Sequence, residues 1–201
     1  MMTFSLIPNS KGIYKSLVNQ DKTIFMMDFD NQDPKFSSEL IDYSYNKELY
    51  YLERLQHYEW IPELLDYGNR KIYFRWYNNT LEEGVPPDVK SQLTHIVSDL
   101  DREQIYKPAL YTKYCYCDLN NNIRTFNWYT SSNYNEQPLE IDFFKPILNP
   151  DRLSLIEQLA TDNKLDMKIL IDRAYNEYIE WPQNILPSIY LEVYGKRLKD
   201  T

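Results

Sequence analysis

In the first half of the chain, the pattern of apolar and polar residues changes from short alternating runs to helical spacing and back. Turn-forming Pro, Asn, Gly and Asp residues separate the short runs, which predicts strands rather than helices. Ser37 and Ser38 offer a helix start, and the apolar residues after them recur at helical spacing, so one helix is predicted over roughly 38–56. The predicted strands are 3–7, 13–18, 23–29, 63–67 and 71–77.

The second half is predicted to be mostly helical. Pro86, Pro87 and Asp88 precede a single apolar stripe, Val89 to Leu100, which is typical of an amphipathic helix packed on a core. A hairpin is embedded among the helices, because the turn-forming residues 118–122 lie between two β-prone runs. The hairpin strands are predicted at 111–117 and 123–129, and further helices at 150–161 and 166–180.

This order of elements predicts an α+β fold. Residues 1–80 are expected to form a sheet-rich region with a mostly antiparallel sheet and one helix across it. Residues 81–201 are expected to form a small, mainly helical region that contains the hairpin. Since no long Gly/Ser linker separates the two regions, we expect one compact unit.

Composition narrows the classes of function. The chain is 43% apolar and 26% charged, which is enough for a buried core. A formal charge of −8 argues against a nucleic-acid binder, which needs clustered Lys and Arg, and no apolar run approaches the roughly 20 residues of a membrane span. Cys115 and Cys117 are too close for an unstrained disulfide, so a reducing compartment is expected. We therefore expect a cytoplasmic protein that binds neither nucleic acid nor membrane.

The predicted helix and the residues after it resemble the small lobe of protein kinases. In kinases the long helix of this lobe carries a Glu followed by leucines, then a His and an aliphatic residue before the next strand. Glu48, Leu52, Leu55, His57 and Ile61 match that order. The resemblance extends over about residues 3–130 and implies a kinase-like, two-lobed fold with a nucleotide cleft.

The same resemblance places the phosphotransfer chemistry on residues that cannot perform it. The strand lysine that holds the nucleotide phosphates, and pairs with Glu48, falls on Met27. The catalytic Asp and the metal-binding Asn fall on Ala109 and Tyr114, and the metal-binding Asp of Asp-Phe-Gly falls on Asn127. Because positioning and charge neutralisation supply nearly all of the rate, the resemblance implies an inactive, pseudokinase-like domain without nucleotide or metal cofactor.

A domain of this kind is expected to act by binding another protein. The sequence indicates an aromatic surface for that purpose, although packing in the core is the alternative interpretation of the same rings. The two cysteines are expected to face inward, reduced, with the neighbouring tyrosines against the small lobe or a partner. The candidate surface residues are Trp76, Tyr77, Tyr114, Tyr116, Trp128 and Tyr129.

Two alternatives remain open at this stage. One is an atypical but active nucleotide-dependent transferase, in which Lys15, on the strand next to Met27, replaces the missing lysine and Asp118 or Asp142 holds a metal. The other is a structural or assembly component of a virion. Abundant Tyr and Asn with scarce Gly and Ala are typical of A/T-rich genomes, so we expect a phage-encoded accessory protein with a host or viral partner.

Overall fold

The computed structural model describes two compact units of an α+β protein. Unit 1 comprises Met1–Gly84 with Lys113–Tyr129, and unit 2 comprises Val85–Thr112 with Thr130–Thr201. The predicted helices over 150–161 and 166–180 lie outside the described residues, as do Ala109 and Asp142. The described residues are 1–8, 12–30, 33–77, 80–107, 110–133, 181, 185–186, 188–189 and 192–193.

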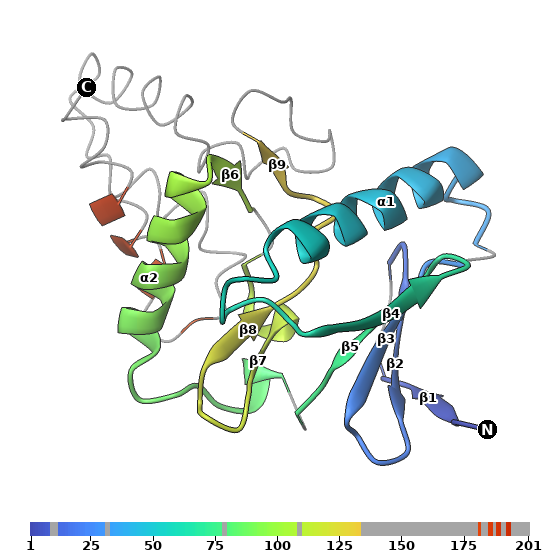
Figure 1. Cartoon of the computed structure of the whole chain (residues 1–201), viewed down its shortest axis with the longest axis horizontal. Coiled ribbons are helices and arrows are strands. Elements are labelled where there is room, and N and C mark those ends of the chain that lie inside the picture. The colour runs from blue at the N-terminus through green and yellow to red at the C-terminus, as the bar shows by residue number, and fades with distance from the viewer. Residues whose placement is uncertain are drawn as a thin grey trace. The chain divides into compact units, whose positions relative to one another are not determined.

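Unit 1 is built on a five-stranded sheet with the order β1-β2-β3-β5-β4 (Figure 1). Every neighbouring pair of strands is antiparallel, as predicted. Asn69 and Arg70, with φ of 50° and 60°, form the tight turn between β4 and β5, and this backbone matches the right-handed twist of the two strands. The strands are β1 Phe4–Leu6, β2 Lys15–Asn19, β3 Ile24–Asp28, β4 Leu64–Gly68 and β5 Lys71–Arg75.

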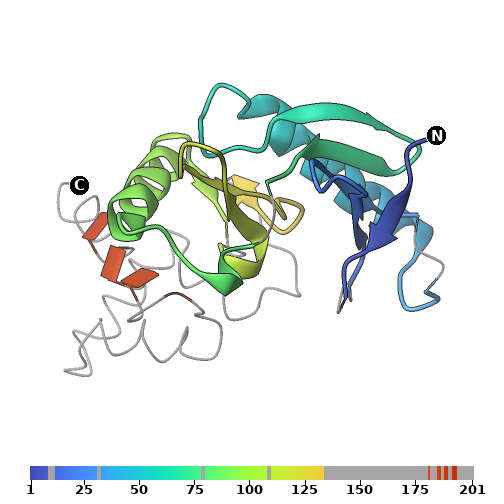
Figure 2. The ribbon, with the colours of Figure 1, turned by 90° about the horizontal axis from the view of Figure 1, so that it is seen from below.

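Helix α1, Ser38–Arg54, lies along one face of this sheet (Figures 1 and 2). It begins where expected, because the Ser37 Oγ accepts the backbone N–H of Leu40 at 3.1 Å. Arg70 fixes the same end from the β4–β5 turn by donating to Asp42 and Ser38, each at 2.8 Å. The buried stripe of α1 consists of Ile41, Ser44, Glu48, Tyr51 and Leu52.

An aromatic core fills unit 1 between the sheet and the hairpin of β7, Cys115–Cys117, and β8, Ile123–Thr125. Phe25 of β3 stacks on Phe74 of β5 with ring centroids 4.8 Å apart. Tyr116 of β7 is parallel to Phe74 at 6.2 Å, and its hydroxyl donates to the backbone oxygen of Arg75 at 2.7 Å. The hairpin therefore belongs to the sheet unit, although the residues that flank it in sequence belong to unit 2.

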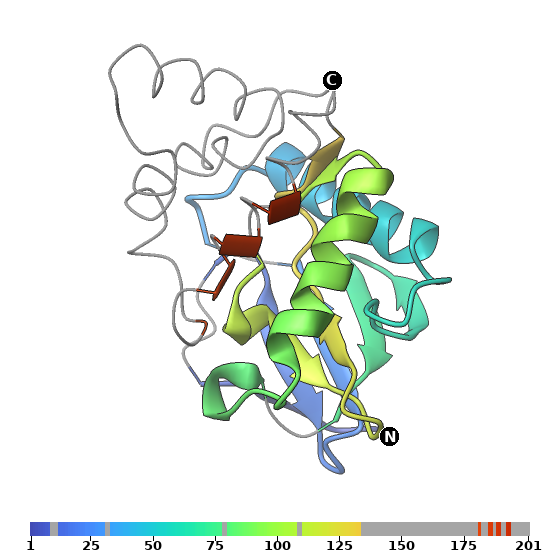
Figure 3. The ribbon, with the colours of Figure 1, turned by 90° about the vertical axis from the view of Figure 1, so that its left-hand side faces the viewer.

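Unit 2 contains helix α2, Val89–Arg102, and a short antiparallel pair, β6 Ile105–Tyr106 and β9 Ser132–Asn133 (Figure 3). The predicted apolar stripe of α2 is buried at Leu93, Ile96, Val97 and Leu100. Trp181 is also buried, and its indole N–H donates to the backbone oxygen of Leu110 at 2.9 Å. Neither α-helix in the described part of the chain is long and apolar enough to cross a membrane.

The prediction of a five-stranded antiparallel sheet with one helix after its third strand is confirmed. The first hairpin strand is wrong in its upstream half, where Thr112–Tyr114 form a short 3-10 helix and only Cys115–Cys117 form the strand. Thr112 and Cys115 are both buried, and this three-residue spacing of buried positions suits a 3-10 turn. A second 3-10 helix, Leu81–Glu83, precedes α2.

Candidate functional site

Glu48 is the centre of the candidate site in unit 1. Its side chain lies on the buried face of α1 and is completely shielded from solvent. The carboxylate accepts the backbone N–H groups of Asn127 at 3.0 Å and Tyr129 at 2.7 Å, and also that of Trp128. Burying a carboxylate is costly unless hydrogen bonds replace its hydration, and three N–H donors provide that replacement.

The backbone after β8 presents these three donors because of its local conformation. Asn127 has a φ of 68°, in the left-handed region that Asn adopts more readily than most residues. A left-handed residue in a turn directs successive N–H groups to one side and creates a small anion-binding concavity. In this protein the anion in that concavity is the side chain of Glu48, so α1 is tied directly to the end of the hairpin.

Tyr14, the residue directly before β2, also contacts this turn. Its hydroxyl donates to Oδ1 of Asn127 at 2.7 Å, and its ring lies 5.2 Å from that of Phe29 and 6.1 Å from that of Tyr129. Burial, and then the nearby Tyr114, Glu48 and Tyr129, raise the pKa of Tyr14 well above its ordinary value. Tyr14 therefore stays a neutral donor at physiological pH, and the amide oxygen of Asn127 is turned toward it.

Met27 and Lys15 lie on opposite faces of the sheet. Met27 on β3 is completely buried and pairs with Ser16 on β2, and residues paired directly across two strands point to the same face. Lys15 is the neighbour of Ser16 in sequence, so it points to the other face, where it is exposed and pairs with Asp28. A lysine that took over the role of position 27 would have to project from the face of Met27.

The predicted aromatic surface is divided between core and surface. Trp76, Tyr116 and Trp128 are buried, which agrees with the packing interpretation of these rings. Trp128 packs against Trp60 with ring centroids 5.8 Å apart, and its indole N–H donates to the backbone oxygen of Thr125 at 2.9 Å. The remaining candidates, Tyr77, Tyr114 and Tyr129, are half-buried.

The two cysteines of β7 are free thiols with different exposure. Cys115 is buried as expected, whereas Cys117 is half-buried. Tyr116, between them, points into the aromatic core, so β7 is buried on both faces at its start and becomes more open toward its end. The expectation that both thiols are inside therefore holds fully for Cys115 alone.

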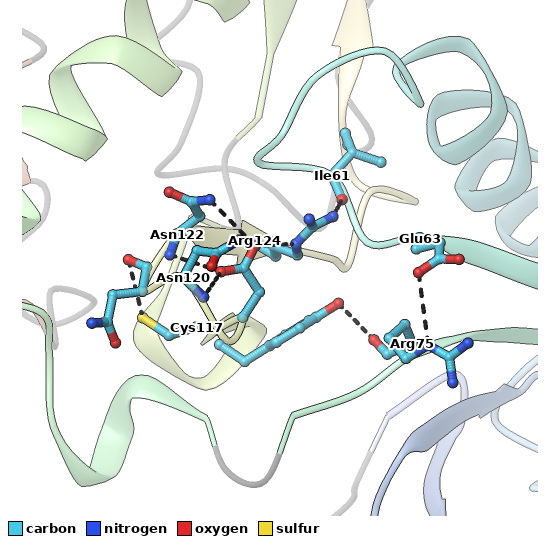
Figure 4. A network of polar contacts seen from close by, with 10 residues as sticks. Ile61, Glu63, Arg75, Cys117, Asn120, Asn122 and Arg124 are labelled. Carbon is cyan, nitrogen blue, oxygen red and sulfur yellow. Dashed lines mark hydrogen bonds and ion pairs between the residues drawn. The ribbon is translucent and has the colours of Figure 1, made fainter.

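Asp118, one of the two metal-ligand candidates of the transferase hypothesis, is hydrogen-bonded within its own hairpin. Its partners Asn120, Asn122 and Arg124 are labelled in Figure 4. One carboxylate oxygen accepts the backbone N–H groups of Asn120 at 2.8 Å and Asn122 at 3.0 Å, and the other accepts Nε of Arg124 at 3.0 Å. Arg124 in turn donates to the backbone oxygen of Ile61 at 2.6 Å. Burial alone would raise the pKa of Asp118, but the two backbone donors and Arg124 outweigh it, and the pKa is lowered.

Comparison of the chain with known protein families and with curated proteins finds no match. In the described ranges, no group of three or more His, Cys, Asp and Glu side chains is arranged to hold a metal ion.

The sequence pattern singled out Glu48 and Asn127 as candidate site residues, but it did not indicate Tyr14 or the three backbone N–H donors to Glu48. The only available signal was the tolerance of Asn for a left-handed turn.

Replacing Glu48 by Gln should destabilise the protein by about 2–4 kcal/mol. The amide retains one acceptor oxygen but turns an NH₂ group toward N–H donors that then lose their partner. The free energy of unfolding, from urea denaturation, measures the effect, and hydrogen exchange at Asn127–Tyr129 should accelerate. The matched control is Glu53→Gln on the same helix, exposed, with an expected change of about 0.5 kcal/mol or less. Equal effects of the two substitutions would contradict the proposed role of Glu48.

Asp118→Asn should remove a pH-dependent part of the stability. The lowered pKa of Asp118 adds stability that is complete above the ordinary Asp value near 3.9 and is lost as the pH falls through the lower, folded-state value. The unfolding free energies of wild type and variant should therefore differ most near pH 7 and converge in acid. Asp21→Asn, an exposed substitution with the same charge change, is the control. A difference that stays constant down to pH 2 would refute this assignment.

Trp128→Ala should cost about 3–5 kcal/mol of stability, because it empties a fully buried position and leaves the backbone oxygen of Thr125 without its indole donor. Tyr50→Ala, at an exposed ring, should cost about 1 kcal/mol or less. Thermal and urea unfolding of both variants make the comparison. A Trp128→Ala protein as stable as Tyr50→Ala would contradict the packing role of this ring.

Proposed function

We propose that this chain is a kinase-like, two-lobed domain that lacks phosphotransfer activity and acts by binding another protein. The proposal is based on the hydrogen bonds that the Glu48 carboxylate accepts from the backbone N–H groups of Asn127–Tyr129. In the kinase resemblance these two segments are the long helix of the small lobe and the Asp-Phe-Gly position. Their direct contact, and the position of α1 between β3 and β4, fit that resemblance.

The chemistry around this contact supports the loss of phosphotransfer. A kinase uses a lysine and metal-bound carboxylates to neutralise phosphate charge. At the corresponding positions this chain has the buried, apolar Met27 and the neutral amide of Asn127, which accepts a hydrogen bond from Tyr14. The Glu48 carboxylate has three backbone donors, so it has a structural role that needs no lysine.

Among the candidate residues of the rival transferase hypothesis, Lys15 and Asp118 lend it no support, and Asp142 lies outside the described residues. Lys15 projects from the face of the sheet opposite to Met27, and both carboxylate oxygens of Asp118 are occupied within the hairpin. A domain with apolar Met27 and neutral Asn127 at two of the kinase positions is expected to act through its surface. We therefore propose a host or viral protein as the partner. The amino-acid composition, which is typical of A/T-rich genomes, favours a phage-encoded accessory role in the cytoplasm.

Millimolar ATP with Mg²⁺ should leave the melting temperature nearly unchanged. A ligand at 100 times its dissociation constant would stabilise the folded state by roughly 2.7 kcal/mol, which corresponds to about 5–10 °C for a domain of this size. The missing lysine and metal-ligand positions should keep the affinity below that range. The measurement is a thermal-shift titration of wild type and Lys15→Ala. A clear shift that disappears in Lys15→Ala would overturn the proposal in favour of the transferase.

The binding part of the proposal has its own test. Affinity capture with the whole chain should yield one dominant protein, with equal recovery in the presence and absence of ATP. Capture that requires ATP and Mg²⁺, or no specific capture from any host extract, would contradict it.

A further inference from the structure

The two edge strands of the sheet in unit 1, β1 and β4, differ in how they are protected (Figure 1). An edge strand presents unpaired N–H and C=O groups, and proteins block such edges with bulges, charged side chains or prolines. On β4 the ladder shifts register between Leu64 and the charged Asp66. Side chains also cap N–H groups of this strand. Gln56 Oε1 accepts the N–H of Leu64 at 3.2 Å, and Asp66 Oδ1 accepts that of Tyr67 at 2.9 Å.

The β1 edge has none of these devices, and its backbone is open. Residues 1–10 contain no charged side chain, and no proline occurs before position 8. The backbone N–H of Ile7 donates to the oxygen of Ser16 on β2 at 2.8 Å, so these two residues form a hydrogen-bonded pair. Such pairs alternate along an antiparallel ladder. The N–H and C=O groups of Phe4 and Leu6 therefore point away from the sheet.

The side chains of β1 add an apolar border to this open edge. Phe4 and Leu6 are two positions apart and share one face of the sheet, and Met2 continues the alternation in sequence. The ring centroid of Phe4 lies 5.8 Å from that of Tyr73 on β5, so Phe4 extends across this face. Leu6 and Met2 remain 55% and 58% exposed. The strand thus combines free backbone groups with exposed apolar side chains.

The β1 edge is complementary to a second copy of itself. When two such strands pair antiparallel about a twofold axis at Phe4, each Phe4 faces the other, and Met2 of one copy faces Leu6 of the second. The alternation directs the backbone groups of all three positions outward. This register therefore forms about six backbone hydrogen bonds and places only apolar side chains opposite one another.

We propose that the β1 edges of two copies of this chain pair antiparallel and join their five-stranded sheets into one. Charge supports this occupant. At a formal charge of −8, two copies repel each other over most of their surface, whereas the β1 edge brings no charged side chain to the contact. The inference goes beyond the proposed function, because it concerns contact between copies of the chain and not the captured partner.

The expected dimer is weak. The strand has three residues, and its pairing buries less than the roughly 1,200–2,000 Å² of a stable interface. We expect a dissociation constant of about 10–100 µM, so the dimer forms as concentration rises. A strand of a different protein is the other occupant that an open edge accepts. The twofold match of Met2 with Leu6 favours a second copy, and a different protein is an outcome of the test.

Sedimentation velocity of the whole chain, from about 1 to 500 µM, should show a monomer–dimer equilibrium. Leu6→Lys places a charge on the edge and should weaken dimerisation by at least about tenfold. Leu119→Lys is the matched control, because it makes the same replacement at a side chain that is 84% exposed in the hairpin turn, and it should leave dimerisation unchanged. Leu6→Pro removes an outward N–H that β1–β2 pairing does not use, and it should act like Leu6→Lys.

Circular dichroism should confirm an unchanged fold in all three variants. A wild type that stays monomeric at the highest concentration, a dimer that persists in both Leu6 variants, or an equal loss in Leu119→Lys would overturn the inference. Affinity capture identifies the other occupant. If the wild type is monomeric and Leu6→Lys alone loses a captured protein, the edge binds a strand of that protein and the inference is wrong.

Discussion

A single buried carboxylate holds together three parts of unit 1 that are distant in sequence. Glu48 belongs to α1, its three N–H partners belong to the turn after β8, and Asn127 of that turn is bonded to Tyr14 before β2. A charge in this position without donors would be among the most destabilising features a core can contain. Because the donors come from backbone, their position depends on the left-handed turn at Asn127 and on the seating of the hairpin against the sheet.

In the proposed kinase-like fold, the same interaction is consistent with an apolar residue at position 27. In a phosphotransferase a lysine at this position and the helix glutamate neutralise each other. With three backbone N–H groups on Glu48, a lysine would itself be a buried charge competing for an occupied acceptor. Met27 instead extends the packed layer of Phe25 and Phe29 on the same face of β3. In the proposed kinase-like fold, an apolar residue at position 27 and the backbone donors of Glu48 are therefore mutually consistent, because the glutamate has a structural role that needs no lysine.

Local chemistry explains which parts of this fold were predictable. The strand boundaries and the start of α1 depend on turn formers and on Ser37, whose effects act within a few residues and are visible in the sequence. The role of Tyr14 depends on a contact 113 residues away in sequence, to Asn127, which no local pattern encodes. Trp76 and Tyr116 pose a related difficulty. An aromatic residue in a strand suits a binding surface and a core equally well, and only the packing of the hairpin onto β5 places these rings inside.

The buried and the exposed sides of α1 have different surroundings. Residues that follow one another by one position on a helix point about 100° apart, so Glu48 and Lys47 act on different surroundings although they are neighbours in sequence. The three hydrogen bonds of Glu48 fix the rotation of α1 about its axis, and Arg70 fixes its first turn. A helix held in this way presents its exposed side chains in one defined direction within unit 1. In the proposed function this glutamate therefore has a structural role, because its hydrogen bonds to the backbone of Asn127–Tyr129 hold α1 in a defined orientation.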